Sequence, residues 1–440
     1  MREAPTTRWF SPEFLVLNSR EWRPNSSESV PNQGLVWIAL AWYHRPMQAP
    51  DPILCVGYQA GLLKALRSTA RGAFVLLPKD QAPPDAEEVL GWAEVDLHGP
   101  AQELESAALK LLGGARPAAV MAMAERTVLC AARLRESFGL PGNHSEVALC
   151  CADKVEMKRA MDKAGVPVAA WREVDKTTTA AALVEQLGLP LVLKPRRDSG
   201  GRGQSKHTDE ADVAHGLQAL RDSGGFEEGY GWLAEAWIEG VESSLESFVQ
   251  AGEPVFMNPT EYYVPRHANI LPAALDGPTF AHRREFMTRA LKAAGVERGI
   301  THMEVFETAK GLVFGELAIR APGGRLMPLI RRAWGFDPWE ASLRLELGEE
   351  VRFPVEPCKI AGVWILHPGV GSTQSIDGLE AALELPGVRS IRLKVGVGES
   401  IAKRLGTGQD IGSIHVEGAS RDAVAESLSA ARETLKIELC

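Results

Sequence analysis

The stretch that decides the fold is KPRRDSGGRGQSK, residues 194–206, which packs five basic residues and three glycines into thirteen positions. It follows the apolar run LPLVL, which predicts a buried strand that ends at Lys194. Successive glycines let the backbone approach a ligand closely and present its N–H groups, while cationic side chains neutralise negative oxygens. The stretch differs from the GxxxxGK[ST] loop, because no Lys-Ser or Lys-Thr pair opens a helix after the glycines. Taken alone, it predicts either a phosphate clamp or a solvated basic turn.

The composition of the whole chain limits the partners of this stretch. At roughly 150 residues per domain, 440 residues predict about three folding units, and 45% hydrophobic and 24% charged residues are ordinary for a globular protein. The net charge of −9 opposes nonspecific attraction to nucleic acid or to anionic membranes. We therefore expect neither nucleic acid nor membrane as a partner, and we interpret the basic stretch as a local binding site.

The cysteines and the N-terminus bear on the cellular compartment. The six cysteines include no CxxC pair and no spacing typical of a zinc site or a disulfide framework. The N-terminus lacks the basic and apolar regions of a signal peptide, and no segment approaches 18 apolar residues. We expect a cytoplasmic protein with reduced thiols.

The early part of the chain has the pattern of an α/β domain. A first segment of about fifty residues is rich in tryptophan and contains one predicted strand, LVWIALAW (35–42). From residue 52 to residue 139, apolar strands alternate with helices, which predicts a parallel sheet. The glycines of VGYQAG (56–61) form GxxxG rather than the GxGxxG dinucleotide fingerprint, and no acidic residue is clearly placed at the next strand end. The pattern therefore disfavours nucleotide binding in this part.

From Asp153 the pattern changes to helices and strands that surround the glycine stretch. Turn residues separate two predicted hairpins, one at AGEP (251–254) and one at TAKG (308–311). The predicted helices are 153–165, 179–188, 209–224, 325–335, 338–348 and 420–435, and the predicted strands include 189–194, 232–238, 359–369 and 390–395.

Two lysines precede the glycines in this pattern. Lys154 begins a predicted helix, and Lys194 ends the apolar strand immediately before the glycines. A strand end that projects a lysine beside a glycine loop places an ammonium group near phosphates, whereas the alternative is a side chain that simply reaches solvent. With the glycine loop counted, we favour phosphate contact.

Acidic residues follow the loop in the segment AEAWIEGVESSLES. Glu235 and Glu242 lie on either side of a glycine turn, where carboxylates can accept hydrogen bonds from ribose hydroxyl groups. The backbone of Ala236, Trp237 and Ile238 can read an adenine edge if it forms a free strand margin. A plain acidic edge strand explains the same residues equally well.

A second acidic pair occupies two apolar segments, ITHMEVF and VFGELAIR. If the hairpin turns near Lys310, Glu304 and Glu316 meet at one end of a sheet, where carboxylate oxygens suit magnesium bound to nucleotide phosphates. The alternative is an outward-facing acid on each strand. Arg320, four residues beyond Glu316 on the same strand face, adds a cation that can bind a carboxylate or an acyl phosphate. The glycines that follow, Gly323 and Gly324, complete this candidate centre.

Taken in order, these motifs resemble the ATP-grasp superfamily: DK with Lys154, VLKP with Lys194, the GGRG loop, the E-x-W-I-x-G-x-E segment and the paired acids. The segment GTGQDIGSIHVEGASRDAVAESLSAA (406–431) also resembles the tail of the carboxylate–amine ligases of that superfamily, so the resemblance runs from about Pro117 to the C-terminus. It implies an α/β ATP-grasp fold. The implied regions are an N-terminal parallel α/β domain (1–116), an ATP-grasp core (117–355) with a mobile α+β lid at about 167–236, and a small C-terminal α+β region (356–440) that completes the ligase core.

The resemblance also implies the chemistry. ATP, with Mg²⁺ or Mn²⁺, phosphorylates a carboxylate, and an amine then attacks the acyl phosphate to leave an amide, ADP and phosphate. Lys154 and Lys194 are implied to contact ATP phosphates, and Glu304 and Glu316 to bind the metal. The implied lid loop consists of Ser199, Gly200, Gly201 and Gly203, and the implied adenosine contacts are Glu235, Ala236, Trp237, Ile238 and Glu242.

One residue departs from the superfamily pattern and indicates a particular branch of the superfamily. The superfamily often has Asn two residues after the second acid, whereas this chain has Ala318 there. The form E-x-A-x-R before a glycine-rich turn is similar to the bacterial L-amino acid ligases that make dipeptides, in which Arg320 would steady the phosphorylated intermediate. His267 falls in the segment where such ligases place substrate-pocket residues, and His302 lies two residues before Glu304; a packed or surface imidazole is an equally good interpretation of each. Arg266 and Tyr262 are weaker substrate candidates.

The expected activity is therefore ATP-dependent joining of an amino acid carboxylate to the amine of an amino acid or peptide, in a homodimer. Three alternatives stay open. One is an ATP-grasp carboxylase that activates bicarbonate, although the chain has no obvious biotin-bearing lysine motif. Another is a nucleotide-binding protein without turnover, and the weakest is a dehydrogenase inferred from the early strand–helix alternation.

Overall fold

The structure is a computed structural model that describes residues 50–227, 231–404, 406 and 409–440. The strand predicted at 35–42 lies outside the described residues. Within the described part of the chain, no helix combines the length and the apolar character needed to cross a membrane.

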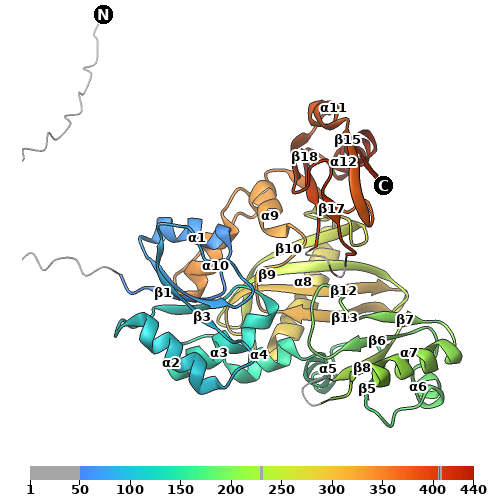
Figure 1. Cartoon of the computed structure of the whole chain (residues 1–440), viewed down its shortest axis with the longest axis horizontal. Coiled ribbons are helices and arrows are strands. Elements are labelled where there is room, and N and C mark those ends of the chain that lie inside the picture. The colour runs from blue at the N-terminus through green and yellow to red at the C-terminus, as the bar shows by residue number, and fades with distance from the viewer. Residues whose placement is uncertain (1–49, 228–230, 405, 407–408) are drawn as a thin grey trace, which may run out of the picture. The chain divides into compact units, whose positions relative to one another are not determined.

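The N-terminal part of the described chain is a four-stranded parallel sheet with strand order β3-β2-β1-β4, as the strand–helix alternation predicts (Figure 1). Its strands are β1 (Ile53–Val56), β2 (Ala73–Pro78), β3 (Val89–Val95) and β4 (Ala119–Ala122). The helices of this part are α1 (Ala60–Leu66), α2 (Ala101–Leu112), α3 (Val128–Ser137) and α4 (Ser145–Ala152), with 3₁₀ turns at Arg67–Thr69 and Glu125–Thr127. Because β4 pairs with β1, this sheet extends past the boundary that the sequence places at residue 116.

The glycine stretch belongs to a smaller antiparallel sheet with strand order β5-β8-β6-β7. Its strands are β5 (Trp171–Val174), β6 (Leu191–Pro195), β7 (Ser205–His207) and β8 (Trp232–Ala236). Helix α5 (Lys154–Lys163) precedes this sheet, and α6 (Ala180–Leu187) and α7 (Glu210–Asp222) pack on it through a shared apolar cluster (Figure 1). Leu193 of β6 pairs with Ser205 of β7, so residues 196–204 form the loop of a hairpin within the range predicted for the lid.

The largest sheet has eight strands in the order β13-β12-β9-β10-β11-β14-β18-β16. These strands are β9 (Val241–Gln250), β10 (Glu253–Val264), β11 (Ala268–Leu271), β12 (Gly299–Thr308), β13 (Gly311–Ala318), β14 (Ile360–Leu366), β16 (Val388–Leu393) and β18 (Gly412–Gly418). The register confirms both predicted hairpins, because Gln250 pairs with Glu253 and Thr308 pairs with Gly311.

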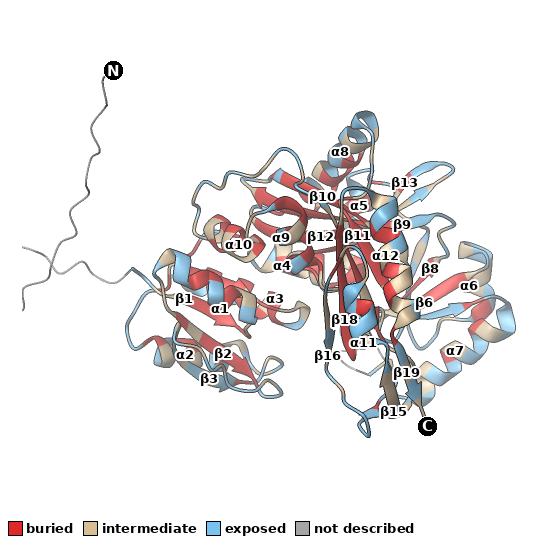
Figure 2. Ribbon diagram, turned by 90° about the horizontal axis from the view of Figure 1, so that it is seen from above, coloured by how far each residue is buried: buried red, intermediate tan, exposed pale blue. Residues whose placement is uncertain are grey.

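Successive side chains of a strand point to opposite faces of the sheet. Both faces are covered along the central strands, which are largely red in Figure 2. Leu245 and Val249 of β9 join the apolar cluster of α5 and α8 (Gly277–Ala294). Phe248, on the opposite face of β9, joins the cluster of α9 (Leu326–Trp334) and α10 (Pro338–Glu346). Two buried faces hold the central strands in a fixed register, and polar side chains at their ends are therefore presented in fixed positions.

The C-terminal region adds β14, β16 and β18 to this sheet. The region also contains α11 (Leu379–Glu384), α12 (Arg421–Thr434) and a three-stranded sheet of β15 (Gly371–Asp377), β17 (Ser400–Ile401) and β19 (Lys436–Leu439). Glu417 of β18 binds three cations from neighbouring elements: Arg332 of α9 (2.7 Å), Lys359 before β14 (2.7 Å) and Arg389 of β16 (3.2 Å).

This cluster predicts a pH dependence of stability. Burial alone would raise the pKa of Glu417, but the hydrogen bonds and charges of Lys359, Arg332 and Arg389 hold it at about 2. The stabilisation is therefore present above the ordinary value of 4.5 and is lost as the pH falls from 4.5 toward 2. Over this window we expect wild-type unfolding free energy to fall more than that of Glu417→Gln, by about 2 kcal/mol. Urea unfolding at a series of pH values checks this; parallel curves for the two proteins would contradict it.

Candidate active site

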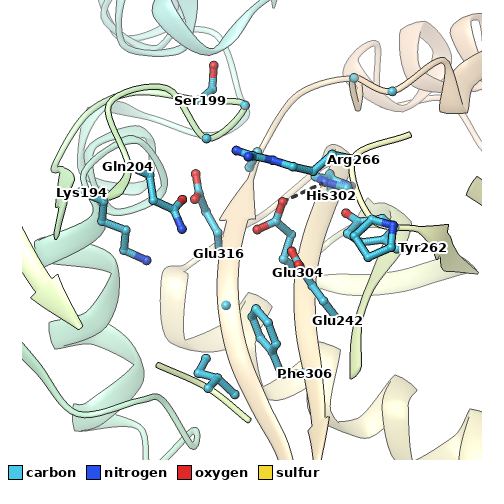
Figure 3. A pocket seen from close by; sticks show the side chains of 18 of the residues that line it. Lys194, Ser199, Gln204, Glu242, Tyr262, Arg266, His302, Glu304, Phe306 and Glu316 are labelled. Atoms are coloured by element: carbon cyan, nitrogen blue, oxygen red, sulfur yellow. Dashed lines mark ion pairs between the residues drawn. The ribbon is translucent and has the colours of Figure 1, made fainter. Parts of the chain in front are cut away.

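A cavity of about 540 Å³ lies between the glycine loop and the ends of β9, β12 and β13. Figure 3 shows Glu304 and Glu316 on neighbouring strands, with Lys194 and Gln204 facing them from the other side. The cavity therefore combines the phosphate-type and metal-type residues that the sequence predicts separately.

The glycine loop contributes Ser199, Gly200 and Gly201 to the cavity wall, whereas Gly203 does not line the cavity, contrary to its predicted role. Gly200 and Gly201 have φ values of +69° and +71°, in the left-handed region that favours glycine. Gly203, with φ +67°, faces Pro195 instead: a Cβ there would lie 3.3 Å from the proline ring. The first two glycines thus shape the wall, and the third shapes the base of the hairpin.

Two arginines of the loop fasten it to α5. Asp153, the N-cap of α5, accepts hydrogen bonds from two backbone N–H groups and from the guanidinium groups of Arg196 (3.0 Å) and Arg197 (3.1 Å). Lys154 Nζ donates to the carbonyl oxygen of Asp198 at 2.6 Å. Arg196 and Arg197 do not line the cavity, so their positive charges position the loop.

Glu235 lies between two lysines. It forms ion pairs with Lys158 and Lys194, and all three side chains are largely buried. Burial alone would raise the pKa of Glu235, but the positive charges of both lysines lower it to about 2. Each carboxylate oxygen of Glu235 pairs with one lysine, so neither is left to accept a hydrogen bond from ribose. Glu235 therefore positions Lys194 instead of making the predicted ribose contact. Lys158 was missed in the sequence, although its spacing of four residues from Lys154 places both on one face of α5.

The prediction that residues 236–238 form a free strand margin is wrong for the first two. β8 lies between β5 and β6, and the N–H groups of Ala236 and Trp237 donate to Ala170 (2.8 Å) and Pro190 (2.9 Å). Trp237 still lines the cavity together with Ala236, Ile238 and Glu242, and its ring lies 3.6 Å beneath the ammonium group of Lys206. This wall can hold a flat ring by stacking and packing.

The two acids predicted to bind metal are direct cross-strand partners. Glu304 of β12 pairs with Glu316 of β13, and Lys154 Nζ lies 3.4 Å from Glu316 Oε1. Burial and the charge of Glu316 raise the pKa of Glu304, and burial and the charge of Glu304 raise the pKa of Glu242 to about 7. A bound cation would relieve this repulsion.

The donor set fits magnesium bound together with phosphates. Among the described residues, no group of three or more His, Cys, Asp and Glu side chains forms a metal cage. Mg²⁺ is commonly held by one or two carboxylates with waters and substrate phosphates, which matches Glu304 and Glu316. Ala318 lines the cavity without offering a donor atom, and its cross-strand partner is His302.

A buried hydrogen-bond network positions the His302 side chain. Its Nδ1 lies 3.0 Å from Glu246, whose carboxylate also accepts hydrogen bonds from Asn258 (2.8 Å) and Thr260 (2.5 Å). Burial lowers the pKa of His302, but the hydrogen bond and charge of Glu246 outweigh burial and raise it overall. His302 Nε2 lies 3.9 Å from Glu304, so this imidazole supports the acidic pair (Figure 3).

The residues predicted to contact substrate differ in whether they line the cavity. His267 does not line this cavity, whereas Tyr262 and Arg266, which are weaker candidates from the sequence, both line it. The reason is local: β10 extends to Val264, and the turn that follows places Arg266 over the glycine loop, where a Cβ on Gly201 would lie 2.5 Å from its guanidinium.

Arg320, Gly323 and Gly324, which the sequence groups with the acidic pair, line the cavity. Arg320 lies beyond the end of β13 rather than on the strand, and its Nε donates to Glu125 at 2.7 Å.

Comparison with known proteins gives the class. The family model described as the ATP-grasp domain matches residues 159–323, and the one described as L-amino acid ligase C-terminal domain 2 matches residues 363–439. Residues 159–323 thus match an ATP-grasp domain, and the predicted class of ATP-dependent carboxylate–amine ligase is confirmed.

Individual relatives indicate the branch. The chain is similar to the L-arginine-specific L-amino acid ligase of Bacillus subtilis, with 24% identity over 73% of this chain and 80% of that protein. The crystal structure of an L-amino acid ligase from Bacillus licheniformis covers 89% of this chain and 99% of its own with a TM-score of 0.75 and 19% identity. The biotin carboxylase domain of Hydrogenobacter thermophilus 2-oxoglutarate carboxylase, in complex with MgADP and bicarbonate, has a TM-score of 0.66 and 18% identity, covering 88% of this chain and 91% of that one.

Proposed function

We propose that this protein is an ATP-dependent ligase that joins the carboxylate of one amino acid to the amine of an amino acid or peptide, with release of ADP and phosphate. The observation that carries the proposal is the meeting, in one cavity, of the Glu304–Glu316 pair, Lys194 and the glycine loop. The family match at 363–439 and the similarity to L-amino acid ligases support the amino acid as substrate.

The reaction proceeds in two steps. A carboxylate oxygen of the first amino acid bonds to the γ-phosphorus of ATP as the bond from that phosphorus to the ADP oxygen breaks. The amine of the second amino acid then attacks the acyl carbon, phosphate leaves, and the amine loses a proton to solvent. When bound, MgATP supplies the phosphoryl group and a divalent charge on its oxygens.

The residues of the chain act by position and charge. Glu304 and Glu316 would hold the metal, with Mg²⁺ as the expected ion and Mn²⁺ as a substitute, and Lys194 would face the phosphates. Lys154 does not line the cavity, so it would act through Glu316, 3.4 Å away, rather than through the predicted phosphate contact. Arg320 lines both this cavity and a second one beside it, and we assign it to the substrate carboxylate. The glycine loop covers the phosphates and keeps water from the acyl phosphate.

The test is a screen of pairs of amino acids and short peptides for ADP release, followed by mass measurement of the product. Amino acid-dependent ADP release with a product of the mass of the two substrates less one water supports the proposal. ADP release that needs bicarbonate and no amino acid would favour a carboxylase, the reaction class of the Hydrogenobacter neighbour. Tight ATP binding without ADP release across the panel would favour a nucleotide-binding protein. The homodimer stays a prediction, which light scattering after size exclusion would check.

A further inference from the structure

A second cavity of about 860 Å³ opens beside the first. The two share the loop residues Ser199 and Gly200, together with Arg320 and the glycines at 323 and 324. Beyond this shared wall the second cavity is lined by α1, α9 and the C-terminal residues around β16. A molecule in the second cavity can therefore reach the phosphate end of the first.

The walls of the second cavity are strongly cationic. The seven basic residues that line it are Lys64, Arg202, Arg320, Arg325, Arg331, Arg392 and Lys394. Its acidic lining residues are Glu125 and Asp410.

Pairing with carboxylates leaves much of this charge unbalanced. Asp410 is shared by Arg325 (3.1 Å) and Lys394 (2.9 Å), and Glu125 is engaged by Arg320. Two further lining arginines have partners outside the lining: Arg202 pairs with Asp198 at 2.7 Å, and Arg331 pairs with Asp337 at 3.2 Å. Seven cations thus face four carboxylates, which leaves an excess of three positive charges.

Lys64 and Arg392 stand out in this set. Both are exposed, and within the described residues neither forms an ion pair or a side-chain hydrogen bond. The positive charge of these residues also acts on His415. Burial is the largest cause that lowers the pKa of His415 to about 4, and the charges of Arg332, Arg392 and Arg325 lower it further.

ATP does not account for these cations. Lys64, Arg325, Arg392 and Lys394 line the second cavity and none of them lines the first, where Lys194 and the acidic pair lie. The charge therefore faces the part of the site left for the substrates.

We propose that the second cavity selects a substrate carrying an additional anionic group, a side-chain carboxylate or a phosphate, held by Lys64, Arg392 and the Arg325–Lys394 pair. This inference rests on the proposed ligase function and names its substrate class: an acidic amino acid, a peptide with an acidic residue, or a phosphorylated amino acid. A guanidinium side chain would meet like charge in this cavity. The arginine specificity named for the Bacillus subtilis relative is thus not expected here.

The test compares charged substrates with neutral isosteres in the ADP-release assay. Glutamate is compared with glutamine, aspartate with asparagine, and O-phosphoserine with serine, each against the same set of second amino acids, with arginine as the opposite charge. We expect kcat/KM to be at least about tenfold higher for the anionic member of the preferred pair. The glutamate and O-phosphoserine arms distinguish carboxylate from phosphate.

Variants connect the preference to the cavity. Arg392→Gln and Lys64→Gln should each lower the ratio of anionic to neutral kcat/KM by about tenfold, mainly through KM. Arg389→Gln, on the same strand β16 but outside both cavities, is the matched control and should leave the ratio unchanged. Arg392→Lys should retain part of the preference, because it keeps the charge.

Two failures are distinguishable. ADP release with neutral or basic amino acids and no anionic preference would overturn this inference and leave the ligase function standing. No ADP release with any amino acid pair would overturn both.

Discussion

Replacing Glu316 by glutamine should strongly reduce ligation while leaving the fold intact. The substitution keeps the shape of the side chain but removes one of the two carboxylates that hold the metal, and it leaves Lys154 Nζ, 3.4 Å away, without that counter-charge. Because the transition state is stabilised by fixed charges, we expect kcat for ADP formation to fall on the order of 10²- to 10³-fold. Coupled-enzyme measurement of ADP with saturating Mg²⁺ checks this.

The matched control for that variant is Glu426→Gln, at an exposed carboxylate of α12 outside both cavities. It should retain wild-type turnover. The circular dichroism spectrum of Glu316→Gln should match that of the wild type, since Glu316 faces the cavity rather than the apolar core. Normal turnover by Glu316→Gln would refute the metal assignment.

Replacing Glu235 by glutamine should damage both stability and ATP binding. The carboxylate is the shared counter-ion of Lys158 and Lys194, and its loss leaves two ammonium groups in one buried site. Removing one partner of a buried ion pair typically costs about 3 kcal/mol or more of unfolding free energy. We expect the Kd for MgATP to rise at least about tenfold as well, because Lys194 loses the group that positions it. Urea unfolding and calorimetric titration measure the two effects.

A double variant separates charge from packing at this site. Glu235→Gln with Lys158→Met restores the original net charge of the cluster, so it should recover much of the lost stability. If the Glu235→Gln single variant has the unfolding free energy and the Kd for MgATP of the wild type, Glu235 does not act as the counter-ion of these lysines.

The sequence predicts those parts of the site that depend on neighbouring residues or on one hairpin. Glu304 and Glu316 could be paired because the turn between them is short, so the register of two strands follows from the turn. Lys194 could be placed because an apolar strand ends at it and glycines follow.

Other features depend on which elements become neighbours, and a single strand does not carry that information. The N–H groups of Ala236 and Trp237 looked available in a lone strand, but β5 and β6 lie on either side of β8. The contacts of Arg196 and Arg197 could not be assigned from the sequence, because both bind Asp153, more than forty residues earlier in the chain. Glu246 could not be recognised as the support of His302, because its partners come from two other strands, β10 and β12.

The second cavity shows the same limit at a larger scale. Lys64 lies on α1 and Arg392 on β16, more than three hundred residues apart, and only the packing of the N-terminal sheet, α9 and the C-terminal strands brings them to one wall. The composition does not indicate this cavity either, because a net charge of −9 does not predict a local cationic surface.

The central claim is that a substrate carboxylate is phosphorylated in the cavity of Glu304, Glu316 and Lys194. The most direct test uses an amino acid with both oxygens of its α-carboxylate labelled with ¹⁸O, incubated with ATP, Mg²⁺ and the second substrate. In the predicted reaction one carboxylate oxygen leaves with phosphorus, so mass spectrometry should find one ¹⁸O atom in each phosphate released. Unlabelled phosphate released in step with ADP would contradict the acyl phosphate and, with it, the proposed ligase mechanism.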